Sequence, residues 1–151
     1  MFHVVLFQPE IPPNTGNIIR LCANTNSELH LIEPLGFSLD DRNLRRAGLD
    51  YHERSSLQLH ASLEAFRQKY PENKLYAVST RGTRTYTNAN YKPGDVFLFG
   101  PETRGLPQTL LDSLPADSVI RIPMKAGNRS LNLANAAAII VYEAWRQNDF
   151  V

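Results

Sequence analysis

Residues 96–107 read Val96-Phe97-Leu98-Phe99-Gly100-Pro101-Glu102-Thr103-Arg104-Gly105-Leu106-Pro107. The first four residues are apolar throughout, a pattern typical of a strand that helices cover on both faces of a parallel sheet. A glycine directly after such a strand, here Gly100, lets a ligand come close to the backbone. The loop lacks the Lys-Ser/Thr pair of a P-loop and the spacing of a G-x-G-x-x-G dinucleotide fingerprint. The segment therefore predicts a buried parallel strand that opens into a glycine-containing loop.

The same alternation of buried strand and amphipathic helix extends over the whole chain. Apolar runs predict further strands at residues 2–7, 29–32, 74–78 and 119–122. Helical spacing and capping residues predict helices at residues 14–26, 40–47, 62–70, 107–114 and 131–147. We expect a single α/β domain over residues 1–151, with a largely parallel sheet and helices on both faces. Ligands of such sheets bind at the carboxyl ends of the strands.

Composition excludes several classes of protein. An apolar share of 42% fits a globular domain, and no apolar run reaches the roughly 18 residues of a membrane span. No signal peptide is recognisable at the N-terminus, and Cys22 is the only cysteine, which we expect to be a buried small hydrophobe. We therefore expect a cytoplasmic protein without membrane association.

Charge and histidine spacing limit the partners. The net charge of +1 does not suit a protein that coats nucleic acid non-specifically, so RNA binding would depend on local positive charge and a shaped pocket. The histidines are His3, His30, His52 and His60, and none has the spacing of a zinc pair such as H-E-x-x-H. The sequence therefore predicts no metal.

A stiff proline loop follows the first predicted strand. It reads Pro9-Glu10-Ile11-Pro12-Pro13-Asn14-Thr15-Gly16-Asn17. Asn14 is a suitable N-cap for the next helix, and Gly16 leaves its first turn open to a phosphate or another backbone. Asn17, Arg20 and Asn24 share one face, which is either a solvated helix surface or, through Arg20, a clamp for phosphate or ribose.

A basic loop joins the last predicted strand to the longest helix. It runs through Ile122-Pro123-Met124-Lys125-Ala126-Gly127-Asn128-Arg129-Ser130. Ser130 or Asn132 can cap the helix, and Asn132 and Asn135 lie three residues apart on one face. The alanines at 134 and 136–138 indicate either plain helix propensity or a close contact within the chain or between subunits.

Together, in this order, the three segments resemble the three motifs of the SPOUT (α/β-knot) RNA methyltransferases. The matching motifs are Asn14-x-Gly16-x-x-x-Arg20, Phe99-Gly100-Pro101-Glu102-x-x-Gly105-Leu106, and Ile122-Pro123-Met124 followed by Ser130-Leu131-Asn132-x-x-Asn135-Ala136. Segments 9–17, 44–52 and 141–146 also resemble the TrmL (YibK) branch, whose members methylate the 2′-hydroxyl of the tRNA wobble nucleotide. The resemblance covers nearly the whole chain.

The resemblance implies a C-terminal trefoil knot, a homodimer with shared active sites, and S-adenosylmethionine as cofactor, with S-adenosylhomocysteine as product and no metal. It assigns cofactor contacts to Val78, Gly100, Ile122 and Ser130. It gives the catalytic residues as Arg20, Glu102 and Asn132, with Arg20 as clamp and charge stabiliser or as base. Asn14, Arg129 and Tyr142 are expected to hold RNA or the dimer interface.

The implied function is 2′-O-methylation of a cytidine or uridine at the wobble position in the tRNA anticodon loop. The 2′-hydroxyl separates RNA from DNA, so DNA is not expected as a partner. Arginines available to hold tRNA are Arg42, Arg45, Arg46, Arg54, Arg84 and Arg129. The alternatives are a SPOUT enzyme that acts on another RNA, such as ribosomal RNA, and a non-catalytic RNA-binding protein. An unrelated nucleotide-binding domain is disfavoured because both nucleotide fingerprints are missing.

Overall fold

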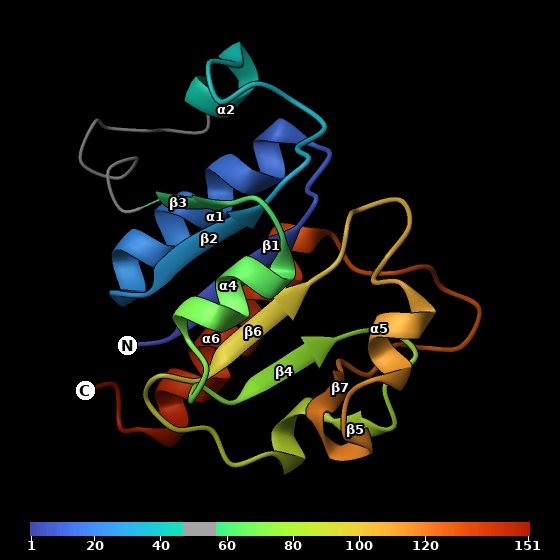
Figure 1. Cartoon of the computed structure of the whole chain (residues 1–151). Helices are drawn as coiled ribbons and strands as arrows, with labels where there is room; N and C mark the ends of the chain where they lie inside the picture. The colour runs from blue at the N-terminus through green and yellow to red at the C-terminus, as the bar shows by residue number, and fades with distance from the viewer. Residues whose placement is uncertain (47–56) are drawn as a thin grey trace.

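A computed structural model describes residues 1–46 and 57–151, and within this part the chain forms one parallel sheet of seven strands. The strand order is β3-β2-β1-β6-β4-β7-β5, and the long strands point the same way in Figure 1. The strands are β1 (His3–Phe7), β2 (Glu28–Ile32), β3 (Leu57–His60), β4 (Leu75–Val78), β5 (Arg84–Thr85), β6 (Val96–Phe99) and β7 (Val119–Arg121). Because all pairs are parallel, every strand ends at the same edge of the sheet.

Helices cover both faces of the sheet, as predicted. They are α1 (Pro12–Thr25), α2 (Arg42–Arg46), α4 (Leu63–Lys69), α5 (Gln108–Asp112) and α6 (Leu133–Gln147), with two short 3₁₀ turns, η1 (Tyr86–Asn88) and η2 (Ala116–Ser118). The buried side chains of α1 and α6 pack in one cluster on one face, and those of α4 and α5 pack in a second cluster on the other.

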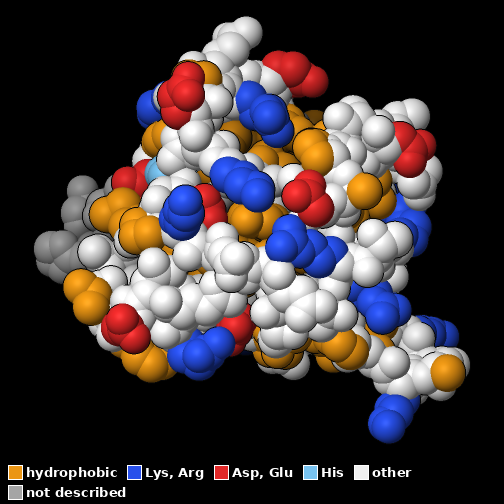
Figure 2. All heavy atoms as spheres, turned by 90° about the horizontal axis from the view of Figure 1, so that it is seen from below, with side chains coloured by type: hydrophobic (Ala, Val, Ile, Leu, Met, Phe, Trp, Pro, Cys, Tyr) orange, Lys and Arg blue, Asp and Glu red, His pale blue; other side chains and the backbone are white. Residues whose placement is uncertain are grey.

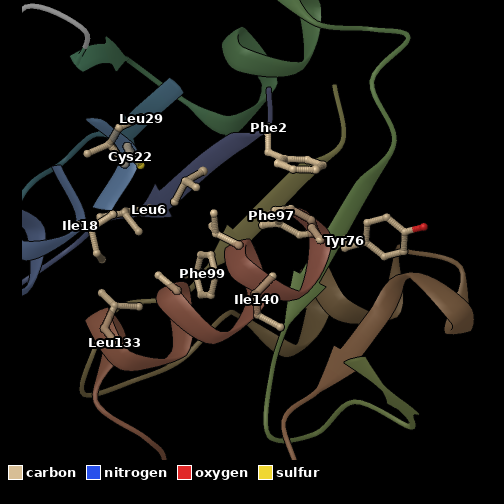
Figure 3. Close-up of a cluster of buried hydrophobic side chains, with 14 of the residues drawn as sticks. Phe2, Leu6, Ile18, Cys22, Leu29, Tyr76, Phe97, Phe99, Leu133 and Ile140 are labelled. Carbon is tan, nitrogen blue, oxygen red and sulfur yellow. The ribbon is translucent and has the colours of Figure 1, made fainter. Parts of the chain in front are cut away.

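The larger cluster fixes α6 against the centre of the sheet. Figure 3 shows Leu133 and Ile140 of α6 facing Phe97 and Phe99 of β6. All four side chains are buried. Burying an aliphatic or aromatic side chain of this size stabilises the fold by about 1.5–3 kcal/mol, so this packing holds the start of α6 beside the strand ends.

Two strands and one helix N-cap differ from the predictions. β3 and β5 were not predicted, because Leu57–His60 alternates without a strong apolar run and Arg84–Thr85 has two residues. Helix α1 starts at Pro12 with Ile11 at the N-cap, so the prediction of Asn14 as N-cap is wrong. Pro12 occupies the first turn, where its missing N–H is not needed, and this places Asn14 inside the helix.

The prediction that Cys22 is a buried small hydrophobe is confirmed. Cys22 is buried, and burial raises the pKa of its thiol to about 12. In the described ranges, none of the helices combines the length and apolar character that crossing a membrane requires. The predicted trefoil knot stays a prediction of the family resemblance.

Candidate active site at the carboxyl ends of the strands

A cavity of about 550 Å³ lies at the edge where β4, β6 and β7 end. Its walls come from the segments that follow these three strands and from the start of α6, within residues 78–81, 99–106, 122–124 and 130–136, with Ile11 and Asn14 beside them. Sites for small organic ligands typically measure about 300–1,000 Å³ and combine apolar walls with a few polar groups. The cavity fits that description.

The structure brings the four predicted cofactor residues into this one cavity. Val78 follows from β4, Gly100 from β6, Ile122 from β7, and Ser130 precedes α6. Glu102 and Asn132, predicted as catalytic, and Asn14 also line it. Val78, Gly100 and Ile122, each 22 residues from the next in sequence, thus converge because parallel strands end at a common edge.

Hydrogen bonds between the loops hold the cavity open. The backbone N–H of Ser79 donates to the carbonyl of Ile120 at 3.0 Å, which ties the end of β4 to β7. The guanidinium of Arg81 donates to Gln108 Oε1 at 2.6 Å. It also donates to the carbonyl of Leu106. Arg81 therefore links the loop after β4 to the loop after β6.

Position 100 must be glycine because the backbone of residues 105 and 106 leaves no room for a Cβ atom. A Cβ at this position would lie 2.4 Å from the amide nitrogen of Leu106 and 2.5 Å from the carbonyl carbon of Gly105. The loop after β6 therefore turns back directly over the strand end. The sequence predicts that Gly100 admits a ligand, but the group that occupies the side of the missing Cβ is the backbone of this loop, so close approach of a ligand at Gly100 stays a prediction.

A reciprocal pair of carboxylates joins the proline loop to the loop after β6. Glu102 accepts hydrogen bonds from the backbone N–H groups of Glu10, at 3.0 Å, and Ile11. Glu10 in turn accepts from the backbone N–H and the hydroxyl of Thr103, at 2.9 and 2.7 Å. These bonds hold the pKa of Glu10 below its ordinary value. Glu102 thus accepts hydrogen bonds from two backbone N–H groups at the start of α1. Through these bonds it positions the proline loop against the loop after β6.

A hydrogen bond between Asn132 and Asn14 connects the third motif to the first. Asn132 Nδ2 donates to Asn14 Oδ1 at 2.9 Å, while Asn132 Oδ1 accepts from the backbone N–H groups of Ala134 and Asn135. Asn132 is therefore the N-cap of α6, one of the two residues predicted for that role. One amide side chain both begins α6 and fixes it to α1.

Three predicted site residues lie outside the cavity. Arg20, Arg129 and Tyr142 are exposed and are not among its described lining residues. Arg20 lies six residues after Asn14, about 9 Å further along the axis of α1. Asn17, Arg20 and Asn24 are all exposed, so the predicted polar face of α1 is confirmed. Gly16 is buried, which excludes an open first turn at that residue.

The predicted arginines for RNA divide into different environments. Arg42, Arg46 and Arg129 are exposed. Arg84 is half-buried, and its guanidinium donates to the carbonyls of Asp117 and Asn88, so it braces the chain. The side chain of Arg45, all of Arg54 and most of segment 44–52 lie outside the described residues.

Charge is mixed on the surface. Figure 2 shows one face on which Lys and Arg side chains are interspersed with Asp and Glu around a central hydrophobic area. The segment between β7 and α6, at the right of Figure 1, is exposed from Lys125 to Ser130. The mixed charge of the face in Figure 2 is consistent with the net charge of +1.

Sequence reasoning missed Arg81, Glu10 and Thr103 as residues that hold the site. Arg81 follows a predicted strand, and that position was a usable signal. Glu10 and Thr103 are 93 residues apart, and nothing in the sequence pairs them.

Comparison with known proteins gives consistent results. Residues 1–142 match the SpoU rRNA Methylase family. A protein of Methylovorus glucosotrophus named tRNA (cytidine(34)-2′-O)-methyltransferase is 55% identical over 150 residues, which cover 99% of this chain and 97% of that protein.

Solved structures show the same similarity. One, described as giving structural insights into the 2-OH methylation of C/U34 on tRNA, has a TM-score of 0.92 and 46% identity, covering 100% of this chain and 98% of the other. Another, an AdoMet-bound rRNA methyltransferase from Sinorhizobium meliloti, has a TM-score of 0.82 and 27% identity, covering 96% of this chain and 56% of the other.

Proposed function

Because this chain belongs to the SpoU methylase family, we propose that it methylates the ribose 2′-hydroxyl of the cytidine or uridine at the wobble position of tRNA. The observation that carries the proposal is the single cavity that residues of all three predicted motifs line, Asn14 from the first, Glu102 from the second and Asn132 from the third. The two relatives named for position 34 of tRNA support the substrate. We place the enzyme in the cytoplasm, where tRNA is modified.

S-adenosylmethionine is the proposed cofactor, and its position is the cavity. Val78 and Ile122 offer aliphatic walls, while the chain around Gly100 and Ser130 offers backbone polar groups. An uncharged adenine suits such walls. When bound, the cofactor would supply a sulfonium methyl group: the bond between sulfur and the methyl carbon would break as the ribose 2′-oxygen bonds to that carbon, S-adenosylhomocysteine would leave, and the hydroxyl proton would pass to water. Among the residues described here, no metal ligand set lines this cavity.

The chain's own residues align the ribose and stabilise its charge. Alignment of two bound reactants can lower a barrier by up to about 7–11 kcal/mol. Glu102 and Asn132 position the strand-end loops and α1 through the hydrogen bonds described above. Arg20 holds a phosphate or ribose oxygen and stabilises the developing negative charge, since a guanidinium remains protonated and is a poor base.

We further propose that the enzyme is a homodimer that completes each site with residues of both subunits. Tyr142, Trp145 and Phe150 form a row of ring contacts at the end of α6, with centroids 5.7 and 5.4 Å apart. Tyr142 is 45% exposed and Phe150 54% exposed. Exposed aromatic surface of this kind is typical of an interface. The position of Arg20 outside the cavity supports its use by a partner's cavity.

The test is mass spectrometry of tRNA after incubation with the protein and methyl-labelled S-adenosylmethionine. We expect one labelled 2′-O-methyl group at the wobble nucleotide and none in ribosomal RNA. Label in ribosomal RNA alone would favour a SPOUT enzyme with another substrate. Absence of cofactor binding by calorimetry would favour a non-catalytic RNA-binding protein.

Arg20→Ala separates binding from chemistry. The variant should fold and bind the cofactor, because Arg20 is exposed and outside the cavity, but its methylation rate should fall by 100-fold or more, about 2.7 kcal/mol of transition-state stabilisation. Asn24→Ala, on the same exposed face, is the matched control. A near-normal rate for Arg20→Ala would remove Arg20 from the mechanism.

A further inference from the structure

Two histidines and a glutamate meet at the edge of the sheet opposite the cavity. His3 and Glu28 are the first residues of β1 and β2 and pair in register. His30 lies two residues after Glu28 and therefore on the same face. This face packs against α4, whose Phe66 contacts the His30 ring at a centroid distance of 4.9 Å. The fold thus gathers groups that lie far apart in the sequence.

The three ligand atoms form a compact triangle. His3 Nδ1 and His30 Nε2 are 3.0 Å apart, and Glu28 Oε2 lies 3.4 Å from the first and 3.6 Å from the second. In a tetrahedral zinc site with bonds of about 2.0–2.1 Å, ligand atoms are about 3.3–3.4 Å apart. The triangle therefore approaches the spacing of three zinc ligands.

His30 has a hydrogen-bonding partner for its second ring nitrogen on the neighbouring strand. His30 Nδ1 lies 2.9 Å from His60 Nε2 on β3. With its proton on Nδ1, His30 donates to His60 and keeps Nε2 for a metal, which is the usual outer-shell arrangement of a ligating histidine.

The negative charge of Glu28 is the feature that allows a cation to bind at this place. Burial opposes any bare cation at this place, and the N-terminal amine and Lys69 add positive charge to the surroundings. The Glu28 carboxylate is the group that offsets these costs. Its side chain is about one-third exposed, and its other described contact is a 3.5 Å hydrogen bond from Gln58 Nε2, so water and ions reach it from solvent.

We propose that His3 Nδ1, His30 Nε2 and Glu28 bind one zinc ion, with water in the fourth position and His60 orienting His30. The ion would join β1 to β2 at the amino edge of the sheet, away from the cavity. Two histidines with one carboxylate are an established zinc ligand set. A neutral hydrogen-bonded row of histidines is the alternative, and it leaves the carboxylate facing both ring nitrogens unused.

The test is a titration of zinc chloride into the chelator-treated protein. Calorimetry measures zinc binding, and metal analysis after dialysis measures the zinc content. We expect one zinc per chain and a rise of Tm with zinc, because an ion that binds only the folded state stabilises it. Glu28→Gln should weaken binding by at least tenfold. Loss of the outer-shell contact in His60→Ala should weaken it by about 10–100-fold.

Two control variants keep the result specific. Glu33→Gln changes a carboxylate just beyond the other end of β2, and His52→Ala removes the remaining histidine of the chain. Both should bind zinc like the unaltered protein. Zinc binding that survives Glu28→Gln undiminished, or that is not saturable at one ion per chain, overturns the proposal. Neither readout uses methyl transfer, so the result is independent of the proposed function.

Discussion

At the residue scale, Gly100 and Gly105 are needed for different reasons. Gly105 has φ +68°, and the nearest atom to an added Cβ is Arg81 Nη2 at 3.6 Å, so its restriction is conformational. Gly100 has no such φ restriction, but an added Cβ would overlap the backbone of residues 105 and 106. Any larger residue at position 100 would therefore displace the loop after β6.

Gly100→Ala should therefore lower the free energy of unfolding more than Gly105→Ala does. Gly105→Ala should cost about 1–2 kcal/mol, the strain of a left-handed L-residue. Gly100→Ala should cost about 3 kcal/mol, typical of overpacking, and should also lose cofactor binding because the cavity wall moves. Urea unfolding and cofactor calorimetry measure both. Equal costs for the two variants would contradict the steric reading of Gly100.

At the element scale, Asn132 has two roles that Asn135 lacks. Its side chain caps α6 and donates to Asn14 on α1, while Asn135 is exposed one turn later. Loss of an N-cap costs about 0.5–2 kcal/mol. Asn132→Ala should therefore lower the free energy of unfolding by about 2 kcal/mol once the lost bridge to Asn14 adds about 1 kcal/mol, and it should weaken cofactor binding.

Asn135→Ala is the matched control, since it changes the same residue type on the same helix. Its stability should stay within about 0.5 kcal/mol of the unaltered protein, as for other surface substitutions. Equal stability of the two variants in urea unfolding would show that the bridge between α1 and α6 contributes little.

The elements also show what the sequence could predict. Five strands, five helices and both faces of the sheet followed from apolar periodicity, and the cavity followed from the position of each motif after a strand. Short edge strands such as β5 were missed because two residues carry no period. Asn14 was misassigned as a cap because Pro12 starts the helix earlier than the polar residue suggests.

Contacts between distant loops were beyond sequence reasoning. The reciprocal bonds of Glu102 and Glu10 join residues more than 90 positions apart, and the histidine cluster depends on strand register. Spacing along one strand cannot show that neighbouring strands place His3 beside His30. The prediction of no metal was drawn from the spacing of histidines along the chain and from the family resemblance.

At the scale of the whole molecule, the buried histidines should make stability fall in mild acid. Burial lowers the pKa values of His3, His30 and His60 from 6.5, to about 3 for His30. Below about pH 6.5 the unfolded chain therefore binds protons that the folded chain excludes, and the free energy of unfolding falls as pH falls, by at most about 1.4 kcal/mol per pH unit for each group.

Urea unfolding between pH 7.5 and 4.5 in the presence of a chelator tests this dependence. Glu10 and Glu143, with lowered pKa values, act in the same direction at lower pH, and Asp95, with a raised pKa, opposes them. The window near pH 6 therefore reports on the histidines. His60→Gln should flatten the curve there, and a flat curve in the unaltered protein would contradict the burial argument.

The shared active site can be tested by mixing two inactive variants. Arg20→Ala lacks the proposed clamp but keeps its cavity, whereas Ile122→Arg places a cation in the cavity wall and should exclude a sulfonium cofactor. If Arg20 of one subunit serves the cavity of its partner, each mixed dimer has one complete site. Random exchange in equal amounts then restores about a quarter of the normal sites in a two-fold symmetric dimer.

Methylation of tRNA by the refolded mixture measures this recovery, and light scattering reports the oligomeric state. Each variant alone should be inactive, because one lacks the clamp and the other lacks the cofactor. Adding Tyr142→Asp to both chains should abolish recovery, since a buried unpaired carboxylate at the proposed α6 interface opposes association. A mixture as inactive as its components, with dimers present, would place Arg20 in the site of its own chain.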